Sequence, residues 1–196
     1  MNIQRVPLKS VASQGWKNGG GLTRELLAFP TAANWQVRIS VAEVTADGPF
    51  SRFEGVQRWF AVLQGAGVRL QVDGQATDLR THDAAFAFDG AASTHCTLLG
   101  GSTQDFNLML RGVQGSLQRV NSRWDVLANA TDLIAIYDLS TTASACFGSE
   151  KCFLESGELL WTVLTAPSKV SVLSSDALCM HIQFNASPGA SQETSV

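Results

Sequence analysis

Histidine is scarce in this chain of 196 residues, and the scarcity limits the metal chemistry that the chain can support. The three histidines are His82, His95 and His181. They lie far apart in the sequence and form no His-x-His pair, whereas a histidine-based metal site needs several such ligands close together. We therefore expect no metal site and no cofactor.

Cysteine is also rare, and long apolar runs are missing. The four cysteines, which form no C-x-x-C pair and are too few for a disulfide scaffold, are Cys96, Cys146, Cys152 and Cys179. We expect free thiols in a reducing cytoplasm. The chain has no uninterrupted run of about 20 apolar residues, and residues 1–7 lack the apolar segment of a signal peptide. We therefore expect no membrane partner.

Charged residues make up only 16% of the chain, and the net charge is -3. Nucleic-acid-binding proteins normally present a basic face, so we expect no nucleic-acid partner. Apolar residues make up 45%, enough for a core. The length suits one compact unit over residues 1–185, which could consist of two fused β-barrel halves with a boundary near residues 112–122. The small, polar residues 186–196 are expected to form a flexible tail.

Short segments of alternating apolar and polar residues predict an all-β fold. In residues 35–42 one face is apolar, and the other includes Arg38 and Ser40. Val68–Val72 alternates too and precedes Asp73-Gly74, a hairpin turn signal. Further candidate strands are Phe60–Leu63, Ala85–Phe88, Thr97–Leu99, Phe106–Arg111, Leu133–Asp138, Leu159–Leu164, Lys169–Leu173 and Leu178–Phe184. A short helix is an alternative at residues 118–127 or 141–146.

The densest motif is the segment Trp16-Lys17-Asn18-Gly19-Gly20-Gly21-Leu22-Thr23-Arg24-Glu25-Leu26. Consecutive glycines weaken a strand, so we expect a ligand or another strand to lie close to this backbone. Thr23 and Glu25 share one strand face, and Arg24 lies on the other. The alternative is a hairpin corner whose polar side chains face solvent.

Two other segments carry polar residues suited to binding. Asp47-Gly48-Pro49-Phe50-Ser51 predicts a tight turn, and Arg58 follows it as either a surface charge or a carboxylate clamp. In Asp105–Arg111, Asn107 and Arg111 lie on the face opposite the apolar residues. That face points either into a barrel mouth or to solvent.

Other catalytic motifs are missing from the sequence. It has no Gly-x-Ser-x-Gly elbow, and the glycine run has the wrong spacing for a phosphate-binding loop. The pair His82-Asp83 could provide a base and its partner, but neighbours in a strand point to opposite faces. No nucleophilic or phosphate-binding chemistry is therefore indicated.

The three polar segments together resemble the signature of the HutD/Ves family. The resemblance covers residues 14 to 112 and includes the glycine motif, Asp47–Ser51 and Asp105–Arg111. It implies a cupin-type double-stranded β-helix (an RmlC-like jelly roll), and a bicupin. It also implies a link to histidine utilisation in bacteria.

With this resemblance, the polar residues are expected to form one pocket at a barrel mouth. Its members would be Lys17, Asn18, Gly20, Gly21, Thr23, Glu25, Arg58, Asn107 and Arg111. The cationic side chains would neutralise a ligand carboxylate, the amides and hydroxyls would supply hydrogen bonds, and the glycines would expose backbone N–H groups. Glu25 would orient an arginine or accept a hydrogen bond from the ligand, and Arg24 would pair with a buried carboxylate.

Three functions fit these expectations. The first is a regulator that limits histidine utilisation by binding a small acidic metabolite, such as N-formylglutamate or urocanate. The second is a metal-free cupin enzyme, an isomerase or hydrolase, with Glu25 or a histidine as its base. The third is an interaction role, in which an open sheet edge forms a homodimer.

Overall fold

The fold is built from strands throughout. The computed structural model describes residues 1–184, so the predicted tail 186–196 lies outside the described residues. Within that part, the one helix is the short 3₁₀ turn η1 (Leu8–Ser10). Among the same residues, no helix has the length and apolar character needed to cross a bilayer. The segments 118–127 and 141–146, where a helix was an alternative, are strands instead.

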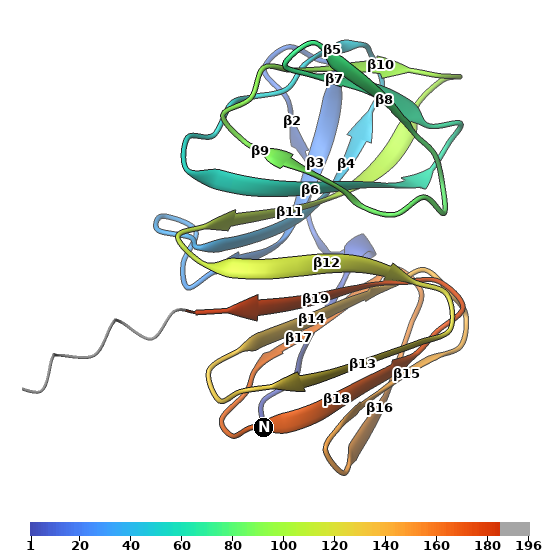
Figure 1. The fold of residues 1–196 in the computed structure, drawn as a ribbon. Helices are drawn as coiled ribbons and strands as arrows, with labels where there is room; N and C mark the ends of the chain where they lie inside the picture. Colours follow the sequence, from blue (N-terminus) through green and yellow to red (C-terminus); the bar gives the residue numbers. More distant parts are fainter. Residues whose placement is uncertain (185–196) are drawn as a thin grey trace, which may run out of the picture.

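The first half of the molecule contains two antiparallel sheets, drawn from blue to green in Figure 1. The six-stranded sheet has the order β2 (Gln14–Gly15), β3 (Gly21–Phe29), β4 (Val37–Val44), β11 (Thr103–Arg111), β6 (Val56–Gln64) and β9 (Phe86–Asp89). The four-stranded sheet has the order β5 (Gly48–Pro49), β10 (Thr94–Leu98), β7 (Val68–Val72) and β8 (Gln75–Leu79).

The second half contains two more antiparallel sheets and also takes in the first strand of the chain. The five-stranded sheet has the order β1 (Gln4–Pro7), β17 (Glu158–Val163), β14 (Leu133–Asp138), β19 (Ala177–Gln183) and β12 (Gln114–Val120). The four-stranded sheet has the order β13 (Arg123–Ala128), β18 (Ser168–Leu173), β15 (Ala143–Phe147) and β16 (Glu150–Leu154). Because β1 pairs with β17, the N-terminus lies in the second half (Figure 1).

The two halves repeat one strand order. Neighbours β4, β11, β6 and β9 of the first half correspond to β12, β19, β14 and β17 of the second. In the smaller sheets, β5-β10-β7-β8 corresponds in the same way to β13-β18-β15-β16. We propose that the halves meet at the turn between β11 and β12, residues 112–113.

Three apolar clusters hold the four layers together. One lies between the six-stranded and five-stranded sheets, where Phe106 packs on Tyr137 with ring centroids 5.2 Å apart. The second fills the interior of the first half around Phe60 and Leu70, and the third fills the second half around Ile136 and Val172. The central cluster therefore joins the halves, because burying this apolar surface favours their association.

Strand alternation decides which side chains enter the interior of the first half. Along β4, Val37 and Ile39 join the cluster between the halves, whereas Ala42 and Val44 join the interior of the first half. Successive residues of a strand point to opposite faces, so Arg38 and Ser40 also face that interior. The polar face predicted for residues 35–42 is thus turned inward.

Candidate functional site

A pocket of about 650 Å³ opens into the first half, above the inner face of the six-stranded sheet. Its walls come from β2 and the loop after it, from β3, β4, β6 and β11, and from β5 with its following loop. The lining residues are Gln14, Gly15, Trp16, Lys17, Asn18, Thr23, Arg38, Ser40, Ala42, Val44, Pro49, Phe50, Ser51, Phe53, Arg58, Phe60, Asn107 and Met109.

Arg58 is the buried cation of this pocket, with only 5% of its surface exposed. Its Nη2 donates to Oδ1 of Asn107 at 3.0 Å, and its Nη1 donates to the carbonyl oxygen of Ser51 at 3.4 Å. Its Nε is buried and has no hydrogen-bond partner within residues 1–184. Burial and the neighbouring charge of Arg38 lower the pKa of Arg58 to about 10, so the guanidinium stays charged at neutral pH.

Aromatic rings surround the Arg58 guanidinium where a carboxylate would usually pair with it. Its Cζ lies 4.9 Å from the ring centroid of Phe88, 5.4 Å from that of Phe50 and 5.8 Å from that of Phe53. Cation–π contacts stabilise such a charge, but they leave its N–H donors unsatisfied. No ion pair involves Arg58 within the described residues. The guanidinium therefore retains a positive charge and an N–H donor that an anion in the pocket could satisfy.

A second arginine, Arg38, lies in register with the first across the sheet. Met109 of β11 pairs with Arg38 on one side and with Arg58 on the other. The Nε of Arg38 donates to Oε2 of Glu25 at 2.6 Å. The charge of Arg38 is thus matched by a carboxylate, whereas no carboxylate of the described residues 1–184 matches that of Arg58.

Aromatic side chains also line the pocket. Trp16 and Phe50 meet edge to face with centroids 6.3 Å apart, and Phe50 lies 5.8 Å from Phe60. The indole Nε1 of Trp16 donates to Oγ1 of Thr23 at 2.7 Å, which fixes the orientation of its ring. A ligand in this pocket therefore meets a cation at one end and flat rings beside it.

Five of the predicted site residues line the pocket: Lys17, Asn18, Thr23, Arg58 and Asn107. Glu25 does not line it but holds Arg38, which does. This arrangement matches one of the two roles considered for Glu25, that of orienting an arginine.

The predicted role of the glycines as free backbone donors is wrong for Gly20. Its N–H donates to Oδ1 of Asn18 at 3.1 Å. At Gly21, an added Cβ would lie 2.5 Å from the carbonyl oxygen of Glu43 and 3.2 Å from the ring of Trp16. A neighbouring strand and an indole therefore require the bare backbone, and neither glycine lines the pocket.

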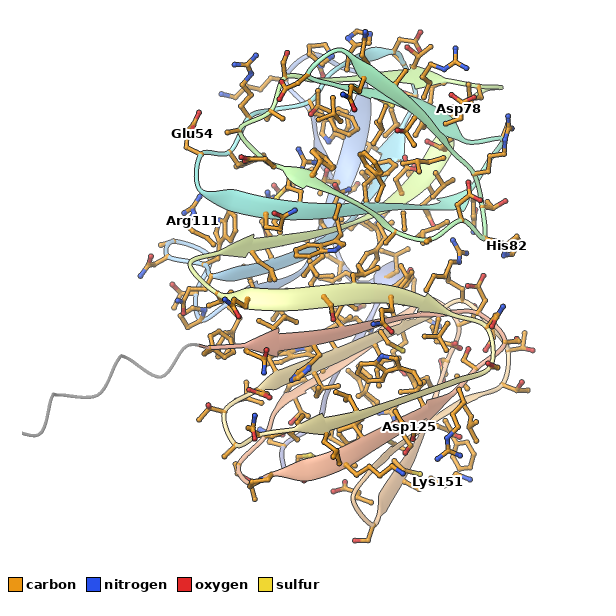
Figure 2. The ribbon with its side chains drawn as sticks, viewed as in Figure 1. Glu54, Asp78, His82, Arg111, Asp125 and Lys151 are labelled. Carbon is orange, nitrogen blue, oxygen red and sulfur yellow. The ribbon has the colours of Figure 1, made fainter. Side chains whose placement is uncertain are left out.

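Arg111 lies outside the pocket, contrary to its predicted place there. Its side chain is exposed, and its Cζ lies 4.2 Å from the ring centroid of Trp35. Figure 2 shows Arg111 at the periphery of the molecule. It is the last residue of β11 and the exposed one at that end of the strand.

Arg24 faces the other side of β3, as its strand position predicts. It pairs with Glu43, but this carboxylate side chain is 36% exposed and so is not buried as expected. Both line a second hollow of about 720 Å³ near η1 and residues 155–158. Because its arginine is already paired, this second hollow offers a weaker attraction for an anion.

Asp105 is a second buried group without a full set of partners. It is fully buried on β11, and its Oδ2 accepts from the hydroxyl of Thr103 at 2.7 Å. Its Oδ1 has no partner within residues 1–184. Burial raises the pKa of Asp105 to about 7, although the hydrogen bond from Thr103 opposes the shift. The interior of the first half thus holds two imperfectly satisfied ionisable groups.

The donor set of the pocket suits an anion. The charged groups that line it are the lysine and the two arginines, whereas metal ions in proteins need imidazole, thiolate or carboxylate ligands. Within the described part of the chain, no group of three or more His, Cys, Asp or Glu side chains is arranged to hold a metal. All four cysteines are free, as expected.

Several pocket residues were missed by the sequence reasoning. Arg38 and Ser40 had been placed on the polar face of their strand without being linked to a site. Trp16 and Phe50 belong to segments that the sequence did single out, yet no pocket role was given to their rings. Their apolar character and loop positions gave no signal of a binding wall.

Sequence comparisons place the chain among known proteins. The sequence model of the family described as HutD matches residues 8–180. An uncharacterised 21.2 kDa protein in the hutC 3' region of Pseudomonas putida is 45% identical over 111 residues, 55% of this chain and 57% of that protein. Protein Ves of Citrobacter koseri is 36% identical over 113 residues, 56% of each chain. The chain thus spans little more than half the length of these relatives.

Structural comparisons extend the likeness over most of the chain. HutD from Pseudomonas fluorescens SBW25, solved in a formate condition, superposes with a TM-score of 0.83 at 27% identity, covering 94% of this chain and all of that one. Salicylate 1,2-dioxygenase from Pseudoaminobacter salicylatoxidans superposes with a TM-score of 0.62 at 7% identity, covering 92% of this chain and 81% of that one, which shows the fold alone. The predicted all-β cupin fold is confirmed.

Proposed function

The chain belongs to the HutD family, and we propose that it binds a small metabolite through a carboxylate group. The observation that supports this proposal is Arg58, a buried cation that lines a pocket and has no carboxylate partner among residues 1–184. A buried charge without a partner is costly, and such a cost is usually retained where a ligand offsets it.

A carboxylate matches the donors that the pocket offers. Its two oxygens accept N–H groups of a guanidinium side by side, and charge-assisted hydrogen bonds of this kind are stronger than neutral ones. Asn107 accepts a hydrogen bond from the guanidinium, and Ser40, its partner across the strands, adds a hydroxyl to the pocket lining.

We further propose that the ligand is an acidic intermediate of histidine breakdown and that binding lets the protein limit that pathway. The support is the name of the family and the hutC neighbourhood of the Pseudomonas putida relative. N-formylglutamate and urocanate are the leading candidates. The enzyme alternative has less support, because its proposed bases, Glu25 or a histidine, do not line the pocket, and Glu25 contacts Arg38 instead.

Calorimetric titration tests the proposal directly. N-formylglutamate, urocanate, histidine and glutamate are titrated separately into the full chain at pH 7. We expect at least one acid to bind with a dissociation constant of about 1 mM or tighter, equivalent to about 4 kcal/mol. The methyl ester of urocanate keeps the ring and the length but lacks the charge, so it should bind much more weakly than urocanate. Failure of all four compounds to bind would count against a carboxylate-binding function.

A further inference from the structure

We infer that the pocket selects a ligand with a single carboxylate on a flat, apolar body over a dicarboxylate, and that Glu25 sets this selectivity. The inference rests on the proposed carboxylate-binding function and specifies its ligand class. It follows from the charges and the rings that line the pocket.

The interior of the pocket leaves one positive charge unmatched. Arg58 is 5% exposed and carries no paired carboxylate among residues 1–184. Arg38 is held by Glu25 at 2.6 Å, so this pair adds no net charge. Lys17 is exposed at the rim, where water and salt screen its charge. One buried positive charge remains, and it matches one carboxylate.

Aromatic and other apolar side chains face the rest of a ligand that is bound to Arg58. The apolar part of the lining beside Arg58 includes Phe50, Phe53, Phe60 and Met109, and Trp16 of the loop after β2 adds its ring; polar side chains such as Thr23 and Ser40 complete the lining. A second carboxylate placed against these groups would lose its water without gaining a cation, which is unfavourable. A planar apolar group would instead replace water on the ring faces.

The position of Glu25 lets it neutralise Arg38. It lies on β3 opposite Ser40, directly before the irregularity in the β3–β4 register that separates Glu25 from Leu27. From there its carboxylate reaches the neighbouring Arg38 on β4. Replacing Glu25 by Gln keeps the shape of the side chain and removes its charge. Arg38 would then become a second uncompensated cation, and the pocket could hold two carboxylates.

The test compares two matched pairs of probes by calorimetry at pH 7. Urocanate and trans-cinnamate each carry one carboxylate on a planar ring; N-formylglutamate and glutarate each carry two carboxylates and no ring. For the wild-type chain we expect the planar acids to bind at least about tenfold more tightly, since a buried unpaired polar group is strongly disfavoured. For Glu25→Gln we expect the ratio of the affinity for the planar acids to the affinity for the dicarboxylates to fall by about tenfold or to reverse.

Glu43→Gln is the matched control. It makes the same chemical change and also removes an ion pair with an arginine, Arg24, but on the opposite face of the same two strands. We expect it to leave the ratio within about twofold of the wild-type value, because surface ion pairs contribute little.

Each result bears on a different claim. Tighter binding of the dicarboxylates to the wild-type chain, or an unchanged ratio in Glu25→Gln, would overturn this inference and leave the carboxylate-binding function standing. No binding of any probe at millimolar concentration would overturn the function itself. The wild-type ranking alone decides the ligand class, so a Glu25→Gln chain that failed to fold would not remove the test.

Discussion

Arg58 and Arg119 are both buried arginines, one in each half, and their surroundings differ. Arg119 forms two hydrogen bonds to Asp176, each 2.8 Å long, and a third to the carbonyl oxygen of Val62 at 2.9 Å. Arg58 contacts an amide, a carbonyl at a longer distance and three aromatic rings, but no carboxylate of residues 1–184. Arg119 thus belongs to a network of hydrogen bonds within the fold, whereas Arg58 Nε has no hydrogen-bond acceptor among residues 1–184.

The same contrast holds for the inner faces of the two larger sheets. In the second half, the inner face carries the fully buried apolar residues Ile134, Ile136, Leu160 and Cys179, and the polar residues Asp138 and Thr162 on that face are fully buried too. In the first half, the inner face carries Arg38, Ser40, Arg58 and Asn107, and a pocket opens above them. The two buried side-chain atoms without partners, Arg58 Nε and Asp105 Oδ1, also lie in the first half of the described chain. The same strand order thus carries a closely packed interior in one half and a pocket among polar side chains in the other.

The largest expected effect comes from placing a charge in the filled half. Ile136 has no exposed surface, so Ile136→Arg should destabilise the fold by more than about 4 kcal/mol or prevent folding. Denaturant unfolding measures the change. Leu127→Arg is the control in the same half, because Leu127 is 79% exposed and should tolerate the charge within about 0.5 kcal/mol. Near-normal stability of Ile136→Arg would show that the second half is not filled.

The next largest effects are the changes in acid binding and in stability when Arg58 or Arg119 is replaced by methionine. Arg58→Met should weaken binding of the tightest acid at least about 100-fold, close to 3 kcal/mol, because the carboxylate loses its buried partner. The stability of the fold should hold or rise, since an unpaired buried charge is removed. Arg119→Met should do the reverse: it removes the guanidinium that gives Asp176 two hydrogen bonds, leaves the exposed His82 beside this carboxylate, and should lower stability by about 2 kcal/mol. Calorimetry measures the affinity of both variants for the acid, and thermal unfolding measures their stability. Equal changes in stability for the two variants would contradict the expected contrast.

A smaller effect concerns the pH dependence of stability. The pKa of Asp105 in the folded chain, about 7, lies above its ordinary value of 3.8, so the folded state holds this proton more tightly than the unfolded chain. Its contribution to stability is therefore present below pH 4 and is lost as the pH rises to 7. Asp105→Asn carries no charge, so its stability relative to the wild type should increase by about 2 kcal/mol between pH 5 and pH 8. Parallel pH series of unfolding would show the difference; a constant offset between them would contradict it.

The smallest effect is expected at Arg111. Its guanidinium lies over Trp35 outside the pocket, so Arg111→Ala should change acid binding by less than about twofold and stability by about 0.5 to 1 kcal/mol. Calorimetry with the tightest acid measures the first quantity. A loss of affinity comparable to that of Arg58→Met would mean that the binding site extends to this edge.

Strand alternation predicted much of the fold and part of the site. Alternation put Asn107 on a polar face, the turn Asp47–Ser51 drew attention to Arg58 after it, and the family resemblance joined both in one pocket, which both line. Alternation also assigned Arg38 and Ser40 to one polar face, but a polar face looks the same in sequence whether it points to water or into a barrel. The contact between Arg38 and Glu25 spans two strands, so no local pattern could reveal it.

Where the prediction failed, the reason is geometric. Arg111 has the same parity as Asn107, but it is the last residue of β11, and the ring of Trp35 lies against it there. Gly20 was expected to offer its N–H to a ligand, but the side chain of Asn18 accepts it. Alternation fixes the face of a side chain and does not indicate where a strand ends or how a turn folds back.

A crystal structure of the chain with urocanate tests the central claim most directly. The account predicts a ligand in the first-half pocket, with its carboxylate within about 3 Å of the Arg58 guanidinium and its ring beside Phe50 and Trp16. A ligand in the second half or on the outer surface, with the Arg58 guanidinium still unpaired, would contradict it.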